Sequence, residues 1–199
     1  MIGPATATEP PSKAKRAPAL APDDRRAMIV LATLPLLLEH GERVTSRQIA
    51  EAAGIAEGTI FRVFSDKDEI IAAVIEAALD PQPLELALED IPDGLSFEEA
   101  LAAAVVIIQQ RVIDVWRLTS SVGTRFHELT RRPVSDSDAL VRLFEAHRDE
   151  IQVAPAVAAR LLRALTLSTT HPMLAGEPRT PAELVHLFLH GVAGKAGSC

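Results

Sequence analysis

The segment from Ser46 to Val63 has residue types and spacing that suit two short helices joined by a tight turn. Ala50 is small enough for a second helix to pack over the first, and Gly54 can take the positive φ that such a turn requires. Apolar residues occupy the positions that the helix pair would bury: Ile49, Ala53, Ile55, Ile60 and Val63. In a helix-turn-helix the second helix enters the major groove. The segment therefore predicts recognition of double-stranded DNA.

The elements that must position this segment are all predicted to be helices, about nine in number, because apolar residues recur at helical spacing and strand-like alternation is absent. Capping residues, glycines and prolines set the expected boundaries. A first helix capped by Asp23 or Asp24 ends at His40-Gly41, with a kink at Pro35. The other helices are expected at about 45–53, 56–64, 66–80, 97–132 with a break near 120–123, 136–147, 155–170 and 181–191, with a loop up to Gly94.

Composition narrows the class of protein. Of the 199 residues 48% are hydrophobic but only 4% aromatic, so the core must be aliphatic. The single cysteine, Cys199, favours a reducing compartment. No apolar run reaches the roughly 18 residues that a membrane span needs, and the N-terminus lacks the apolar middle of a secretory signal. We therefore expect a cytoplasmic protein with no membrane partner.

The net charge of −7 is unevenly distributed. Residues 69–199 carry eleven basic and eighteen acidic side chains, whereas residues 1–22 carry Lys13, Lys15 and Arg16 against Glu9. DNA binding would therefore depend on a few placed contacts and would weaken with salt. The proline-rich segment 1–22 predicts a disordered basic arm, either simply solvated or touching DNA.

The stretch from Arg25 to about Leu79 resembles the DNA-binding domain of the TetR family. The resemblance is carried by Thr45, Ile49-Ala50, Ala53-Gly54-Ile55, Gly58-Thr59-Ile60-Phe61, Phe64, Lys67 and Ile70. It implies a helix-turn-helix DNA-binding domain at 23–68 and a helical ligand-binding and dimerisation domain at 69–199. It also implies a homodimeric repressor that binds a palindromic operator and is released by a small apolar ligand.

The resemblance also implies roles for individual residues. Thr45 and Lys67 would meet phosphates, Gly58 would allow a close approach to DNA, and Thr59 would face a phosphate or a thymine methyl group. Arg47 and Arg62 would contact guanine or phosphate. Glu57 would accept from cytosine or simply favour the helix start. The full set is Thr45, Ser46, Arg47, Glu57, Gly58, Thr59, Phe61, Arg62 and Lys67. Phe61 and Val63 replace the family's usual Tyr and His, which removes two hydrogen bonds worth about 1 kcal/mol each.

Two further sets of residues are predicted from helix faces. A ligand pocket, with ordinary core as the alternative, would be lined by Ile108, Gln109, Val112, Trp116, Phe126, His127 and Phe144. The last two helices are apolar on more than one face, so one face can serve a dimer seam. The candidate seam residues are Ala158, Leu161, Leu162, Leu165, Leu184, Leu187 and Phe188.

Other chemistries find little support in the sequence. His186 and His190 lie four residues apart, but no carboxylate or thiol is placed with them, so we expect no metal. We find no nucleophile elbow, glycine-rich phosphate loop or paired carboxylates, and expect neither an enzyme nor a cofactor. Two alternatives remain open. One is an activator or ligand-independent regulator, and the other is a protein–protein interaction module that keeps the helix-turn-helix as a scaffold.

Overall fold

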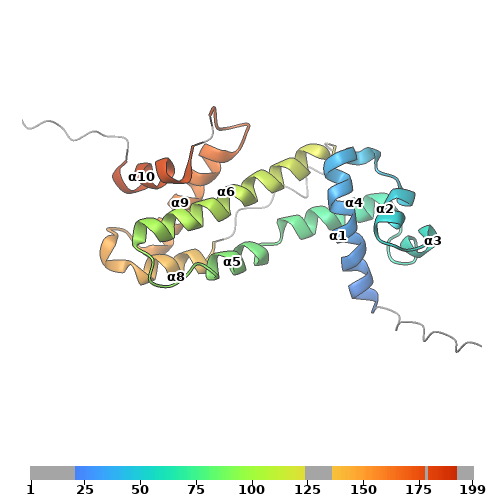
Figure 1. Cartoon of the computed structure of the whole chain (residues 1–199), viewed down its shortest axis with the longest axis horizontal. Helices are drawn as coiled ribbons and strands as arrows, with labels where there is room; N and C mark the ends of the chain where they lie inside the picture. The colour runs from blue at the N-terminus through green and yellow to red at the C-terminus, as the bar shows by residue number, and fades with distance from the viewer. Residues whose placement is uncertain (1–20, 124–135, 178, 192–199) are drawn as a thin grey trace, which may run out of the picture.

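The computed structural model describes residues 21–123, 136–177 and 179–191, and the regular structure of these residues is entirely helical. Figure 1 shows an elongated arrangement with the N-terminal helices at one end. These are α1 (Pro22–His40), the 3-10 turn η1 (Gly41–Arg43), α2 (Ser46–Ala52), α3 (Glu57–Ile60) and α4 (Lys67–Leu79). The remaining helices are α5 (Gln82–Glu89), α6 (Phe97–Ser121), α8 (Asp138–Ala146), α9 (Pro155–Thr170) and α10 (Pro181–His190), with the 3-10 turn η3 (Arg148–Glu150) after α8.

The first helix ends as predicted but begins differently. Gly41 stops α1 with a φ of 59°. The N-cap is Ala21 rather than Asp23 or Asp24, because Pro22 can take the first helical position without losing a hydrogen bond. Both aspartates lie in the first turn instead, where their negative charge favours the helix dipole. The kink at Pro35 stays a prediction.

The prediction of a loop between α4 and Gly94 is wrong, because this segment contains α5. Pro81 is the N-cap of α5 and Pro83 lies in its first turn, where a missing N–H costs nothing. Leu84 and Leu88 lie one turn apart, and both are buried. The two prolines therefore start a new helix as well as ending α4 at Leu79.

The C-terminal helices begin at their capping residues. Ser96 and Thr180 each form a capping box, with Glu99 and Glu183 respectively, as predicted. Helix α8 is capped by Ser137, not by Ser135 or Asp136, because the Ser137 hydroxyl accepts from Leu140 N. α6 ends at Ser121, and the predicted continuation over 124–132 lies outside the described residues.

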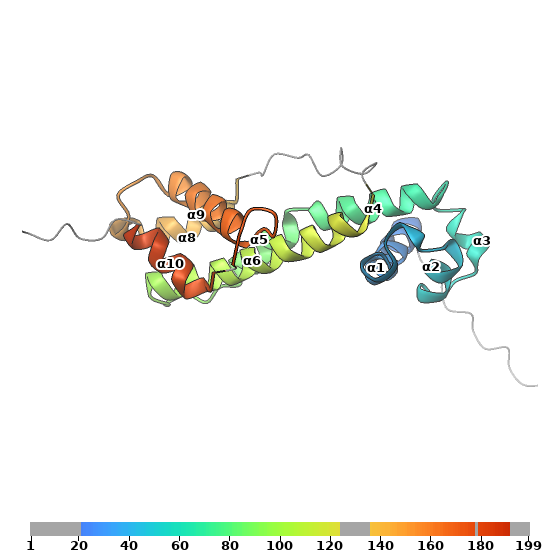
Figure 2. The ribbon, with the colours of Figure 1, turned by 90° about the horizontal axis from the view of Figure 1, so that it is seen from above.

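Two hydrophobic cores hold these helices. One is formed by α5, α6, α8, α9 and α10 around Leu101, Phe144 and Leu184. The other is formed by α1 to α4, and it also includes Leu118 and Val122 from the end of α6. Figure 2 shows α6 running between the two ends of the molecule. The N-terminal core continues through α4, past the domain boundary we predicted between residues 68 and 69. None of the described helices is long and apolar enough to cross a membrane.

Candidate nucleic-acid interface

Helix α2 is held by the capping box that its sequence predicts. The Thr45 hydroxyl accepts from Gln48 N at 3.2 Å, and the Gln48 side chain accepts from Thr45 N at 2.9 Å. Thr45 is exposed, so its hydroxyl and the first N–H groups of α2 lie at the surface. A helix N-terminus of this kind favours a negatively charged group such as a phosphate.

The turn between α2 and α3 depends on Ala50 and Gly54, as predicted. Gly54 has a φ of 65°, and Ile55 N donates to Ala50 O at 3.0 Å across the turn. Ala50 and Ile60 are buried where the two helices meet. The second helix is shorter than the expected 56–64: α3 ends at Ile60. After Ile60 the chain continues in tighter turns as far as Phe64. In these turns Arg62 N donates to Thr59 O, and Val63 N donates to Ile60 O.

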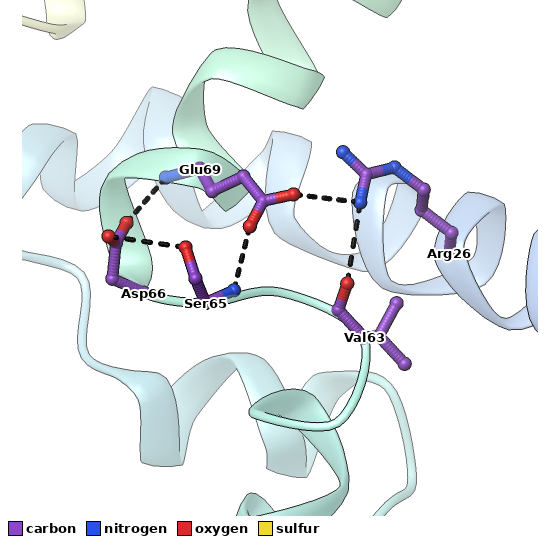
Figure 3. A network of polar contacts seen from close by, with 5 residues as sticks. All are labelled: Arg26, Val63, Ser65, Asp66 and Glu69. Atoms are coloured by element: carbon purple, nitrogen blue, oxygen red, sulfur yellow. Dashed lines mark hydrogen bonds and ion pairs between the residues drawn. The ribbon is translucent and has the colours of Figure 1, made fainter.

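A polar network that the sequence did not reveal supports these turns (Figure 3). Arg26 on α1 donates to the Glu69 carboxylate at 3.0 Å and to Val63 O at 3.4 Å, and its guanidinium lies 4.2 Å from the centre of the Phe64 ring. Glu69 also accepts from Ser65 N at 2.7 Å. This backbone hydrogen bond, followed by the one from Arg26, holds the pKa of Glu69 below its usual value. Arg26 and Glu69 thereby fix the end of the recognition segment against α1 and α4.

The predicted DNA-contacting residues lie close together in the chain's first third, mostly at the surface. Gly58 is exposed, and a Cβ added to it would meet no atom within 4 Å. Phe61 is 52% exposed, an unusual setting for a phenyl ring, which could contact a thymine methyl group. Thr45, Arg47, Glu57 and Arg62 are also exposed, while Ser46, Thr59 and Lys67 are partly buried.

Besides Thr45, three of these residues have side-chain hydrogen bonds within the protein. The Ser46 hydroxyl donates to the Glu57 carboxylate, which links the N-termini of α2 and α3. Lys67 Nζ donates to Glu42 O at 2.6 Å. The Glu42 carboxylate in turn accepts from Gly123 N at 2.6 Å, just beyond α6. Lys67 therefore lies where the N-terminal helices meet the end of α6.

The predicted pocket residues that the structure describes do not gather at one place. Ile108 and Val112 line a cavity among α5, α6 and α9. Gln109 instead donates to Arg179 O at 2.9 Å, and Trp116 is half-buried farther along α6. Phe144 is fully buried and packs against Phe97 and Phe188. Phe126 and His127 lie outside the described residues.

The predicted dimer residues divide in a similar way. Ala158, Leu162 and Leu184 are buried in the protomer's own core. Leu165, Leu187 and Phe188 are partly buried, and Leu161 is 53% exposed. His186 and His190 have ring centroids 4.7 Å apart. Within the described residues, no group of three His, Cys, Asp or Glu side chains could hold a metal ion.

Comparison with known proteins agrees with this geometry. Residues 29–74 match the family model described as bacterial regulatory proteins, tetR family. An HTH-type transcriptional repressor of Mycobacterium tuberculosis is 29% identical over 146 residues, which cover 70% of this chain and 76% of that protein.

Solved structures share the fold over most of the chain. A TetR-family regulator from Mesorhizobium loti has a TM-score of 0.59 and 16% identity, covering 87% of this chain and 95% of its own. The TetR-family repressor FadR of Thermus thermophilus, solved with lauroyl-CoA, has a TM-score of 0.51 and 19% identity, covering 87% and 98%. Residues 29–74 thus match the DNA-binding domain of TetR-family regulators, and the chain shares its all-helical fold with solved structures of such regulators.

Proposed function

We propose that the protein is a cytoplasmic, homodimeric repressor that binds a palindromic operator and leaves it when a small molecule binds the C-terminal helices. The observation that carries this proposal is the exposed face of α2 and α3. There a Cβ added to Gly58 would meet no atom within 4 Å, and Arg47 and Arg62 are exposed. A small residue with open space above it lets DNA approach the backbone closely, and arginine is the side chain that most often reads guanine.

Dimerisation is supported by the outer face of α9. Val157 and Leu161 lie one turn apart there, with 36% and 53% of their surfaces exposed. One α3 reads few base pairs. Two copies placed about 34 Å apart by a two-fold axis would read adjacent turns of the major groove and give useful specificity.

Repression and ligand release are supported by the relatives. The mycobacterial relative is named a repressor, and the Thermus structure contains lauroyl-CoA. A ligand can release DNA only if it binds more tightly to the conformation whose two recognition segments no longer fit the operator. The position of α6, which has residues in both cores, suits such a coupling.

The test is fluorescence anisotropy with labelled fragments of the promoter region, at two salt concentrations. We expect tighter binding to one palindromic fragment than to shuffled DNA, and weaker binding at higher salt. Arg62→Ala should lower the preference for the operator by about tenfold or more. Lys67→Ala should weaken binding to all DNA alike. Arg148→Ala, in the exposed turn η3 of the C-terminal helices, is the matched control and should change neither.

The outcomes separate the alternatives. If no fragment competes better than shuffled DNA, the repressor proposal fails, and the helix-turn-helix would be a scaffold for protein contacts. If the operator is bound but transcription from it rises with the protein in a reporter assay, the protein is an activator.

A further inference from the structure

The cavity among α5, α6 and α9 has a volume of about 360 Å³. Leu84, Ile108, Val112 and Leu167 give it an apolar lining. This volume lies at the lower end of the range for small-molecule sites, which are mostly apolar with a few polar groups that orient the ligand. The polar groups therefore decide which class of molecule the cavity can hold.

The polar lining of this cavity is predominantly cationic. Arg111, Arg160 and Arg163 line it together with one carboxylate, Asp136. Arg111 and Arg163 are partly buried, and burial lowers the pKa of both guanidinium groups, although an arginine stays protonated in a protein. A partly desolvated cation is costly unless an anion or hydrogen-bond acceptors compensate it.

The nearby carboxylates also serve other donors. Asp136 pairs with Arg160 at 3.4 Å, and Glu85, close to Arg163, accepts from Ala139 N at 2.9 Å. Asp114, close to Arg111, accepts from Gln110 at 2.9 Å. Their negative charge is thus shared between the cavity arginines and these other donors, and an added anion would still be attracted.

We propose that this cavity binds an amphipathic molecule with one anionic head, a carboxylate or a similar oxyanion. The guanidinium groups of Arg111 and Arg163 hold the head, and the apolar lining covers the rest. A neutral molecule of the same shape offers the two guanidinium groups no negative charge, so the site selects acids over alcohols. The inference deepens the proposed function by naming the class of ligand, and its effect on DNA rests on that function.

Arg111 gives the site a connection to the DNA-binding helices. Its Nη2 donates to Asp80 O at 2.7 Å, and Asp80 is the residue that caps the end of α4. A guanidinium has five N–H donors, and this hydrogen bond uses one. An anion that draws Arg111 into the cavity would alter the contact at the end of α4, whose first residue is Lys67.

The experiment is isothermal titration calorimetry of the full chain without DNA. The probes are two acids and the matching alcohols: octanoate with octan-1-ol, and 2-naphthoate with 2-naphthol. We expect at least one acid to bind about tenfold or more tightly than its alcohol. Arg111→Met and Arg163→Met should each remove this preference. Arg148→Met, on the exposed turn η3, should retain it. Circular dichroism shows whether each variant is folded.

The comparison of each acid with its alcohol on the wild-type protein decides the proposal even if a variant does not fold. If neither acid binds more tightly than its alcohol, or if both cavity variants fold and keep the preference, the proposal is overturned. Anisotropy with operator DNA is measured separately. Acid-selective binding without DNA release supports the site but contradicts ligand release in the proposed function. DNA binding by a protein that does not prefer acids supports the regulator and overturns this inference.

Discussion

Gly58 has an unusual position for a helical glycine, because neither the turn geometry nor the protein's packing requires it. Its φ is not positive, and a Cβ would meet nothing within 4 Å. Alanine favours a helix over glycine by up to about 1 kcal/mol. The protein would therefore be no less stable with alanine here, and the benefit of glycine must lie in what approaches α3 from outside.

Gly58→Ala should consequently separate stability from DNA binding. We expect an unchanged or slightly higher melting temperature, together with operator affinity about tenfold lower or more, because a methyl group would stand between the backbone and the DNA. Thermal melting and fluorescence anisotropy measure the two effects. Gly176→Ala, in the loop between α9 and α10, also fills open space and should not affect DNA binding. Wild-type affinity in Gly58→Ala would contradict a close approach of DNA at this residue.

Glu69 makes the recognition segment sensitive to acid. Its folded-state pKa is lowered because its carboxylate accepts from Ser65 N and Arg26. Because the folded-state pKa is the lower of the two, the ionised carboxylate stabilises the fold at any pH above its unfolded-state pKa. This stabilisation is lost as the pH falls through the folded-state pKa. Glu69→Gln should therefore lower the melting temperature at pH 7 and flatten its fall between about pH 5 and pH 3.

Melting curves across this pH range measure the effect. Glu51→Gln, a change of the same kind at an exposed position on α2, is the control and should melt as the wild type does at every pH. Equal pH profiles for Glu69→Gln and the wild type would show that Glu69 does not link stability to pH.

Single residues were predictable from the sequence where their contacts are local. Thr45 caps the helix that follows it and Gly54 forms its own turn, so neighbouring residues carry the whole signal. Arg26 and Glu69 are 43 positions apart, and nothing in either neighbourhood indicates the partner. Ser46 and Glu57 lie in the predicted set, but their hydrogen bond follows from the crossing of α2 and α3, which spacing alone does not fix.

At the scale of elements, the end of α1 meets the end of α6. Gly41 has a φ of 59°, and a Cβ on it would lie 2.5 Å from Ser121 O. The sequence predicted this glycine as a helix stop. The contact with α6 adds a second, steric requirement, which only the folded chain reveals.

Gly41→Ala should therefore destabilise the protein. The positive φ costs a residue with a side chain about 1 kcal/mol, and the contact with a backbone carbonyl adds to this cost. We expect a loss of about 1–3 kcal/mol in the free energy of unfolding, measured by urea denaturation. Gly94 also has a positive φ, 87°, but a Cβ added to it would meet no atom within 4 Å. Gly94→Ala therefore measures the cost of a positive φ without a steric contact. Equal losses in both variants would rule out a steric contribution at Gly41.

The helices at 155–170 and 181–190 were predicted nearly to the residue, because Pro155 marks the start of one and Thr180-Pro181 marks the start of the other. Helix α5 was missed because Pro81 and Pro83 indicate the end of one helix as readily as the start of the next. Helix α3 was predicted too long. Apolar spacing extends to Val63, but after Ile60 the backbone forms tighter turns that keep the same side of the chain buried.

For the whole molecule, the exposed apolar face of α9 predicts a dimer. Leu161→Glu should convert the protein into monomers, because it places two charges at a two-fold seam and removes apolar burial on both sides. Sedimentation velocity measures the mass, and operator binding should weaken in parallel. Leu86→Glu on α5, at a leucine that is 58% exposed, is the matched control and should leave the oligomeric state unchanged. A dimeric Leu161→Glu protein would place the seam elsewhere.

The hydrogen bond between Glu42 in η1 and Gly123, just beyond α6, has a consequence for the exchange of amide protons with solvent. The Gly123 amide is held by one carboxylate at 2.6 Å, and a side chain on Gly123 would collide with that carboxylate. The proton is protected while this hydrogen bond is formed, so its exchange rate reports how often the Glu42 carboxylate leaves Gly123. The exchange of this one amide therefore reports on the contact between η1 and the end of α6, and it can be measured with or without DNA.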